Sequence, residues 1–371
     1  MNIVIAILVF SVLIVIHELG HFIAARRCGI LVEEFSIGMG PKLFGFRPKG
    51  GETLYTLRLL PIGGSCRMLG EDVAPDKAEA SQQSAAAAPE RSFSSKPVSK
   101  RIVVIAAGIV MNLLLAFVAA FVVYSANRFN VPKVDSLIPG YPAEAAGLMP
   151  GDRITKVNGK SVGVAEDVSR LINEKPGDAA RLTLNRDGET VELTVTPMFD
   201  EASGRYLVGF NIGYVLGMFT EAAEGEEDAE RASFLDTAKM GFNFCVSSVK
   251  NIFGFLGQLI TRKMDASQVS GPIGIINLMG DVYNESVATN NPWTVLSNIL
   301  MLVAGLSVNL AVFNFLPIPA LDGGRIVFLI IEAVRGKPVN PEKEGMIHFA
   351  GMVLLMILMV FVAYNDILKI I

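Results

Sequence analysis

Apolar residues gather in four long runs along the chain, and polar segments separate these runs. The runs cover roughly residues 3–25, 102–124, 295–316 and 346–364. About 20 helical residues, each rising about 1.5 Å, cross the hydrocarbon core of a bilayer. The pattern therefore predicts an α-helical polytopic membrane protein with about four transmembrane helices. We place the helices in segments 1–26, 102–125 and, for the last two, 293–371.

The segment between the first two runs, residues 27–101, changes from a helical to a strand pattern. Glycine and proline pairs frame the strand-like run at residues 53–60, and this predicts a β-hairpin or sheet. Residues 74–95 are rich in Ala, Ser, Gln and Pro without hydrophobic periodicity. Such a composition is typical of a flexible linker.

The long segment between the second and third runs carries two further patterns. Residues 131–197 contain alternating runs such as 190–195 around a short helix near 164–173, so we expect a compact α+β domain. Residues 198–292 begin as an acidic linker and continue as an amphipathic helix over 234–261. This helix suits a membrane face, with a soluble amphipathic helix as the alternative.

Composition agrees with a membrane protein. The chain is 51% hydrophobic, and its mean hydropathy of +0.46 is too high for an ordinary soluble enzyme. A net charge of −4 without a concentrated basic face argues against a nucleic-acid partner. Cys28, Cys66 and Cys245 are too far apart for a disulfide framework or a CxxC metal site.

The distribution of charge predicts the orientation, because lysine and arginine near helix ends favour the cytoplasmic side. Basic residues flank the first and third connections, whereas the middle segment, 125–292, is acidic, notably at 221–230. We therefore expect the α+β domain and both termini outside the cytoplasm. The basic residues are Arg26, Arg27, Lys96, Lys100, Arg101, Arg325, Arg335, Lys337 and Lys343.

The first apolar run contains the sequence His17-Glu-Leu-Gly-His21. Positions i and i+4 share a helix face, so His17 and His21 can bind one metal ion while Glu18 faces a water molecule at that ion. A chance match is the alternative, but ionisable groups inside a membrane helix are costly and point to function. A catalytic Zn²⁺ usually takes three protein ligands, so the third must come from elsewhere.

Asp322 and His348 are the candidates for the third ligand. Asp322 follows the run 316–321, whose two prolines must end the third helix, and Gly323 and Gly324 let the backbone approach closely. Depth favours Asp322, because His17 lies roughly 21 Å along a helix that enters from outside, near the cytoplasmic leaflet where the third helix ends. A turn aspartate is the alternative for Asp322, and a hydrogen-bonded interfacial histidine is the alternative for His348.

Three asparagines lie inside the apolar runs. Asn309 and Asn314 are in the third helix and Asn112 is in the second. Buried amides in lipid need partners, so structural hydrogen bonds between helices compete with a substrate-binding role. We choose Asn314, with Asn309, as groups that bind the substrate backbone, and we expect Asn112 to be structural.

The ordered set of motifs resembles the bacterial site-2 protease family of intramembrane zinc metalloproteases, in a single-PDZ subtype similar to the regulator of sigma-E protease. The matching motifs are His17–His21, Glu34–Pro41, Leu60–Gly64, Ala107-Gly108 with Asn112, Ser270–Gly274, Asn309 with Asn314, and Leu321–Gly324. The outer domain matches as well, because residues 142–152 and 157–159 resemble the bacterial PDZ pattern.

The resemblance implies how these parts work together. Asp322 would complete the zinc site, and the hairpin at 53–60 would dip into the membrane and present an edge strand to the substrate. PDZ domains bind extended peptides as an added strand, and in this family the domain would filter substrates by size or sense an earlier cut.

We therefore expect a zinc endopeptidase of a bacterial inner membrane that carries out regulated intramembrane proteolysis. Glu18 would act as general base, and the substrates would be transmembrane segments of single-pass membrane proteins, such as anti-sigma factors or signal-peptide remnants. One alternative is a non-catalytic PDZ scaffold with a structural metal, which would have no use for the base Glu18. Another is an anchored protease that acts on soluble proteins, which would place the histidines outside the bilayer.

Overall fold

The computed structural model describes residues 2–71, 88–201, 204–223, 229–261 and 271–370. Four of its helices are long and apolar enough to cross a membrane, which confirms the prediction from the hydrophobic pattern. They are α1 (Asn2–Arg27), α3 (Val98–Ala126), α8 (Pro292–Phe315) and α10 (Pro341–Ile370). Within α10 only 6% of the most apolar window is buried inside the protein, which leaves its surface for lipid.

The chain forms two compact units. The first unit contains residues 1–116 and 252–371, and the second contains residues 117–251. The two candidate sequences for metal binding, at His17 and Asp322, both belong to the first unit.

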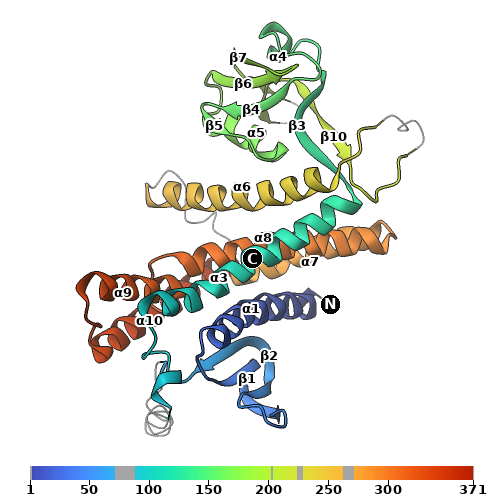
Figure 1. Ribbon diagram of the computed structural model, residues 1–371. Helices are drawn as coiled ribbons and strands as arrows, with labels where there is room; N and C mark the ends of the chain where they lie inside the picture. The colour runs from blue at the N-terminus through green and yellow to red at the C-terminus, as the bar shows by residue number, and fades with distance from the viewer. Residues whose placement is uncertain (1, 72–87, 202–203, 224–228, 262–270, 371) are drawn as a thin grey trace. The chain divides into compact units, whose positions relative to one another are not determined.

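A two-stranded sheet packs along α1 in the first unit (Figure 1). Its strands are β1 (Val32–Phe46) and β2 (Leu54–Met68), so the predicted β-hairpin is present and is longer than the run at 53–60. Both strands bend, with the result that Phe35 pairs with Cys66 as well as Tyr55. Phe35 and Cys66 belong to a buried cluster that also contains Ala24 and Ala25 of α1.

Part of the predicted flexible linker is folded, which corrects the prediction for that part. Residues 72–87 lie outside the described residues. Residues 88–95, however, contain a short 3-10 helix, η2 (Pro89–Arg91), and the buried side chain of Phe93, which joins the cluster beside α1. The small and polar composition concealed this single apolar anchor.

Three helices after the second unit complete the first one: α7 (Pro272–Ala288), α8 and α9 (Asp322–Arg335). Helix α8 ends at Phe315, and Leu316 caps it just before Pro317, as expected. A new helix then begins at Asp322, so this aspartate is the first residue of α9 rather than the end of the third membrane helix. Helix α7 lies in the segment 198–292, where we expected only a linker and one amphipathic helix.

The second unit contains a mixed α+β domain. Its sheet has the strand order β10-β3-β4-β6-β7, with β5 paired to β4, and β8 pairs separately with β9. Apolar residues from the sheet and from α5, among them Ile154, Leu182 and Val168, form one buried core. The elements are β3 (Arg128–Leu137), α4 (Pro142–Ala145), β4 (Arg153–Val157), β5 (Lys160–Ser161), α5 (Ala165–Ile172), β6 (Ala180–Arg186), β7 (Glu189–Val195), β8 (Met198–Asp200), β9 (Arg205–Leu207) and β10 (Phe210–Leu216).

The sheet extends beyond residue 197, where we placed the end of the domain. Strand β10 pairs with β3, and therefore belongs to the sheet although we expected a linker there. After it, helix α6 (Phe234–Ile260) matches the predicted amphipathic helix. Ser247 of α6 donates a hydrogen bond of 2.6 Å to the buried Asp167 of α5, which ties this helix to the domain.

Candidate metal centre

Two glycines bring α1 and α3 unusually close together at the predicted metal site. A Cβ atom on Gly20 of α1 would collide with the backbone of Ala107 on α3. A Cβ atom on Gly108 would lie within 2.7 Å of atoms in both imidazoles, His17 and His21. Small residues at such a crossing let two membrane helices approach closely, and here they let α3 form one wall of the site.

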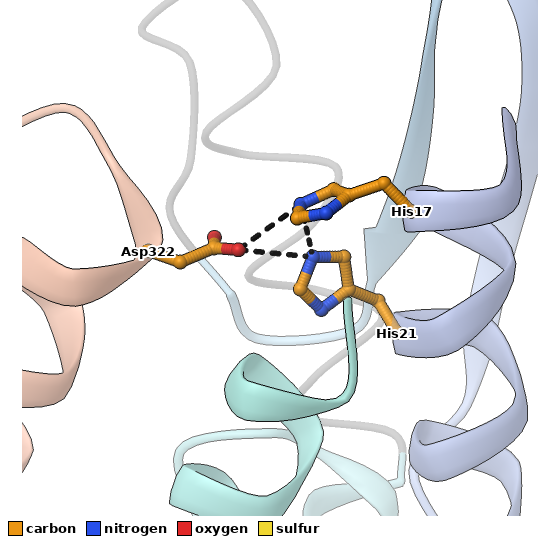
Figure 2. A group of neighbouring side chains, drawn as sticks. All are labelled: His17, His21 and Asp322. Carbon is orange, nitrogen blue, oxygen red and sulfur yellow. Dashed lines mark hydrogen bonds and ion pairs between the residues drawn. The ribbon is translucent and has the colours of Figure 1, made fainter. Parts of the chain in front are cut away.

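His17, His21 and Asp322 converge, as Figure 2 shows. The two Nε2 atoms are 3.1 Å apart, and Oδ2 of Asp322 lies 3.1 Å from His17 Nε2 and 3.4 Å from His21 Nε2. Both histidines are 7% exposed, and the aspartate is half-buried at the start of α9. Three potential ligand atoms from two ends of the chain therefore point to one place.

These separations fit a tetrahedral zinc ion. Zinc binds imidazole nitrogen and carboxylate oxygen at about 2.0–2.2 Å, and tetrahedral ligands at that radius lie about 3.3 Å from one another. The three observed separations are 3.1, 3.1 and 3.4 Å. Two imidazoles and one carboxylate are also a usual ligand set for catalytic zinc, which leaves the fourth position for a reactant.

Hydrogen bonds to residues of α3 orient both imidazoles. His21 Nδ1 lies 2.9 Å from the carbonyl oxygen of Val104, to which it donates, and this leaves Nε2 as the nitrogen that could bind a metal ion. His17 Nδ1 lies 3.2 Å from the side-chain amide of Asn112, a fully buried residue. In the present orientation the amide nitrogen of Asn112 faces His17, and its buried Oδ1 has no hydrogen-bond partner. If the amide is flipped, Oδ1 accepts a hydrogen bond from Nδ1–H of His17.

A cavity of about 360 Å³ opens onto the three residues. Glu18 lines it, half-buried and next in sequence to His17, in the position that the helical spacing predicted for a base. A Cβ atom on Gly64 of β2 would lie 3.3 Å from Glu18 Cγ, so this glycine lets the strand pack against the glutamate. The other lining residues are Ser65, Cys66, Arg67, Met68, Glu71, Ile105 and Arg325.

The remaining candidates lie elsewhere. Asn309 and Asn314 are half-buried on α8, and neither is among the residues that line this cavity. His348 of α10 accepts a hydrogen bond of 2.8 Å from the backbone N–H of Ala320, which agrees with the hydrogen-bonded alternative rather than with a third ligand. Asn112, which we expected to be only structural, is the residue that sequence reasoning missed, although it lies in one of the family motifs.

Comparison with known proteins gives the family. The model of Peptidase family M50 matches residues 5–358. The chain belongs to this family, which comprises the site-2 proteases.

Relatives of this M50 peptidase match over nearly their full length. A Clostridium acetobutylicum protein whose name contains the words zinc metalloprotease is 36% identical over 99% of this chain and 97% of its own. Zinc metalloprotease RasP of Geobacillus kaustophilus is 33% identical over 98% of this chain and 97% of its own. The regulator of sigma-W protease RasP of Bacillus subtilis is 32% identical over 99% of this chain and 98% of its own.

Among solved structures, a PDZ domain of an SdrC-like protein of Listeria monocytogenes is similar to 23% of this chain and 88% of its own, with 21% identity and a TM-score of 0.21. The family and the names of the relatives make this M50 peptidase a zinc metalloprotease with Zn²⁺ as its cofactor, and the family together with the four apolar helices makes it a multi-pass membrane protein.

Proposed function

We propose that this M50 peptidase cleaves peptide bonds in or beside the transmembrane segments of single-pass membrane proteins, with His17, His21 and Asp322 as the zinc ligands. The observation that carries the proposal is the convergence of these three side chains at 3.1–3.4 Å, two of them from inside an apolar helix. Such a placement brings hydrolysis to substrates that lie within the bilayer, whereas a soluble substrate would not reach it.

Each residue at the metal centre has a separate role in peptide-bond hydrolysis. Zinc, when bound, acts as a Lewis acid toward the scissile carbonyl and activates water. Glu18 accepts the proton of the attacking water and returns it to the leaving amine. Asn112 and Val104 keep the imidazoles of His17 and His21 in the orientation and tautomer that present Nε2.

Substrate must be extended at the cleavage point, because the carbonyls of an intact helix are bonded within it. Strand β2 offers a template. Its residues from Ser65 to Met68 line the cavity, and the described pairings of this stretch are with β1 on one side only. A substrate strand added at the open edge would pass the metal centre, with Asn314 and Asn309 as further groups for its backbone.

The orientation follows the distribution of basic residues, with the PDZ domain outside the cytoplasm and the zinc site near the cytoplasmic leaflet. A cavity of about 110 Å³ between α5 and the segment from Tyr206 to Ile212 offers the PDZ domain a place for an extended peptide. An earlier cut outside the membrane would shorten a substrate enough to pass this domain, so we propose anti-sigma-factor-like proteins or signal-peptide remnants as substrates.

The decisive experiment compares wild type with Glu18→Gln against a tagged single-pass membrane protein in the same membrane. Glutamine keeps the shape of the side chain but cannot accept the proton, so we expect a loss of roughly 100-fold or more in cleaved fragment, with zinc content unchanged. A non-catalytic scaffold predicts no difference between the two proteins. Equal cleavage by both would reject Glu18 as the base.

A further inference from the structure

The turn that precedes Asp322 contains a residue with an unfavourable backbone conformation. Ala320, two residues before Asp322, has φ +79°, in a region that side chains of L-residues disfavour. The other described non-glycine residues with positive φ are Asn158, Asp187 and Asn290, types that tolerate it better. An alanine remains in such a conformation only when its surroundings fix it.

His348 supplies a contact that fixes it. Its Nδ1 accepts the backbone N–H of Ala320 at 2.8 Å. The same imidazole packs against Phe328 of α9, the helix that begins with Asp322, with ring centroids 5.4 Å apart. One turn further along α10, a Cβ atom on Gly351 would come within 2.6 Å of Pro319, so the helix backbone itself touches the turn.

We propose that His348 is a positioning residue for the metal centre, which acts by holding Ala320 so that Asp322 faces His17 and His21. The inference rests on the proposed role of Asp322 as a zinc ligand. This role also explains why His348 is not one of the candidate ligands. Its Nδ1, which faces the turn, already accepts a hydrogen bond from the backbone N–H of Ala320.

The test measures the zinc affinity of the purified full-length protein in detergent by competition with a chelator. We expect His348→Leu, which fills the space but cannot accept a hydrogen bond, to weaken zinc binding by roughly 10–100-fold, as is usual for residues that orient ligands. His348→Asn should retain most of the affinity, because its Oδ1 lies near the place of Nδ1 and can accept the same N–H.

A second substitution separates this role from general packing. Glycine adopts positive φ without support, so Ala320→Gly should restore zinc binding in the His348→Leu protein. Met352→Ala is the matched control, since Met352 is 47% exposed on the same helix, and we expect no change in affinity.

Wild-type affinity in His348→Leu would overturn the inference. So would an equal loss in Met352→Ala, or a loss that Ala320→Gly does not restore. If His348→Leu does not fold, His348→Asn is compared with His348→Gln, whose longer side chain misplaces the acceptor, and equal affinities would count against the inference. Asp322→Asn is measured alongside. Unchanged affinity there would reject the ligand assignment itself, whereas its loss beside a normal His348→Leu would reject only the positioning role.

Discussion

At the scale of single residues, Gly108 is a position where the candidate metal centre leaves no space for a side chain. Because a Cβ atom there would lie within 2.7 Å of both imidazoles, we expect Gly108→Ala to displace them and to weaken zinc binding by about tenfold or more. Metal analysis of the purified protein, together with cleavage of the tagged substrate, checks this. Gly305→Ala on α8 is the control, since a Cβ atom there meets nothing within 4 Å and both readouts should stay normal.

The candidate ligand residues stand out in the sequence, whereas the residues that contact them do not. His17, Glu18 and His21 share a local spacing that only a helix needs to realise, and Asp322 stands out because prolines and glycines surround it. Asn112 contacts His17 on another helix, and His348 contacts Ala320 in the turn before α9. Their roles depend on how those helices are rotated and aligned, and no local pattern encodes that.

At the scale of elements, the ion pair between Asp152 and Arg186 joins the start of β4 to the end of β6. The guanidinium donates to both carboxylate oxygens at 2.7 Å and lowers the pKa of the buried Asp152 below its usual range, although burial opposes this. A pKa below that of the unfolded chain means that the pair stabilises the domain fully above about pH 4 and that this contribution is lost as the pH falls further.

Asp152→Asn should therefore destabilise the domain at pH 7 by about 1.5–3 kcal/mol, because charged hydrogen bonds are lost. The same variant should lose less additional stability between pH 5 and pH 3 than wild type does. Hydrogen exchange of the β3–β7 amides in the full-length protein measures both effects. The exposed Asp178→Asn serves as control, and a variant with the same acid dependence as wild type would contradict the assignment.

Besides helix α7, the elements that the sequence concealed were those whose partners lie far away along the chain. The four apolar helices and the break before Pro317 follow from composition and from proline chemistry. Strand β10 could not be predicted in the same way, because its partner β3 comes far earlier in the chain and local alternation does not specify pairing. The anchor at Phe93 was missed for a similar reason, since its apolar neighbours belong to other elements.

At the scale of the whole molecule, apolar surface is not confined to the spanning helices. The β1–β2 sheet exposes a group of large apolar side chains at its far end, among them Leu43, Phe44 and Leu60, which are 55–63% exposed. A patch of this kind is costly in water. It agrees with the expectation that the hairpin dips into the membrane.

Thiol labelling in inverted vesicles, which turn the cytoplasmic side outward, tests this expectation. In a Cys28→Ser background, a cysteine at Phe44 should react much more slowly with a membrane-impermeant reagent than a cysteine at Lys49, in the turn between the strands. Cys66 and Cys245 are buried and contribute little background. Equal labelling of the two positions would place the sheet in water.

The separation of the ligands along the chain has a consequence for biosynthesis. His17 and His21 leave the ribosome well before Asp322, because they come far earlier in the chain. Synthesis proceeds from the N-terminus, so a growing chain carries the proposed general base and two of the proposed ligands through most of its membrane insertion without the third ligand. With this ligand set, the order of translation would delay proteolytic activity until the segment that carries Asp322 has been synthesised.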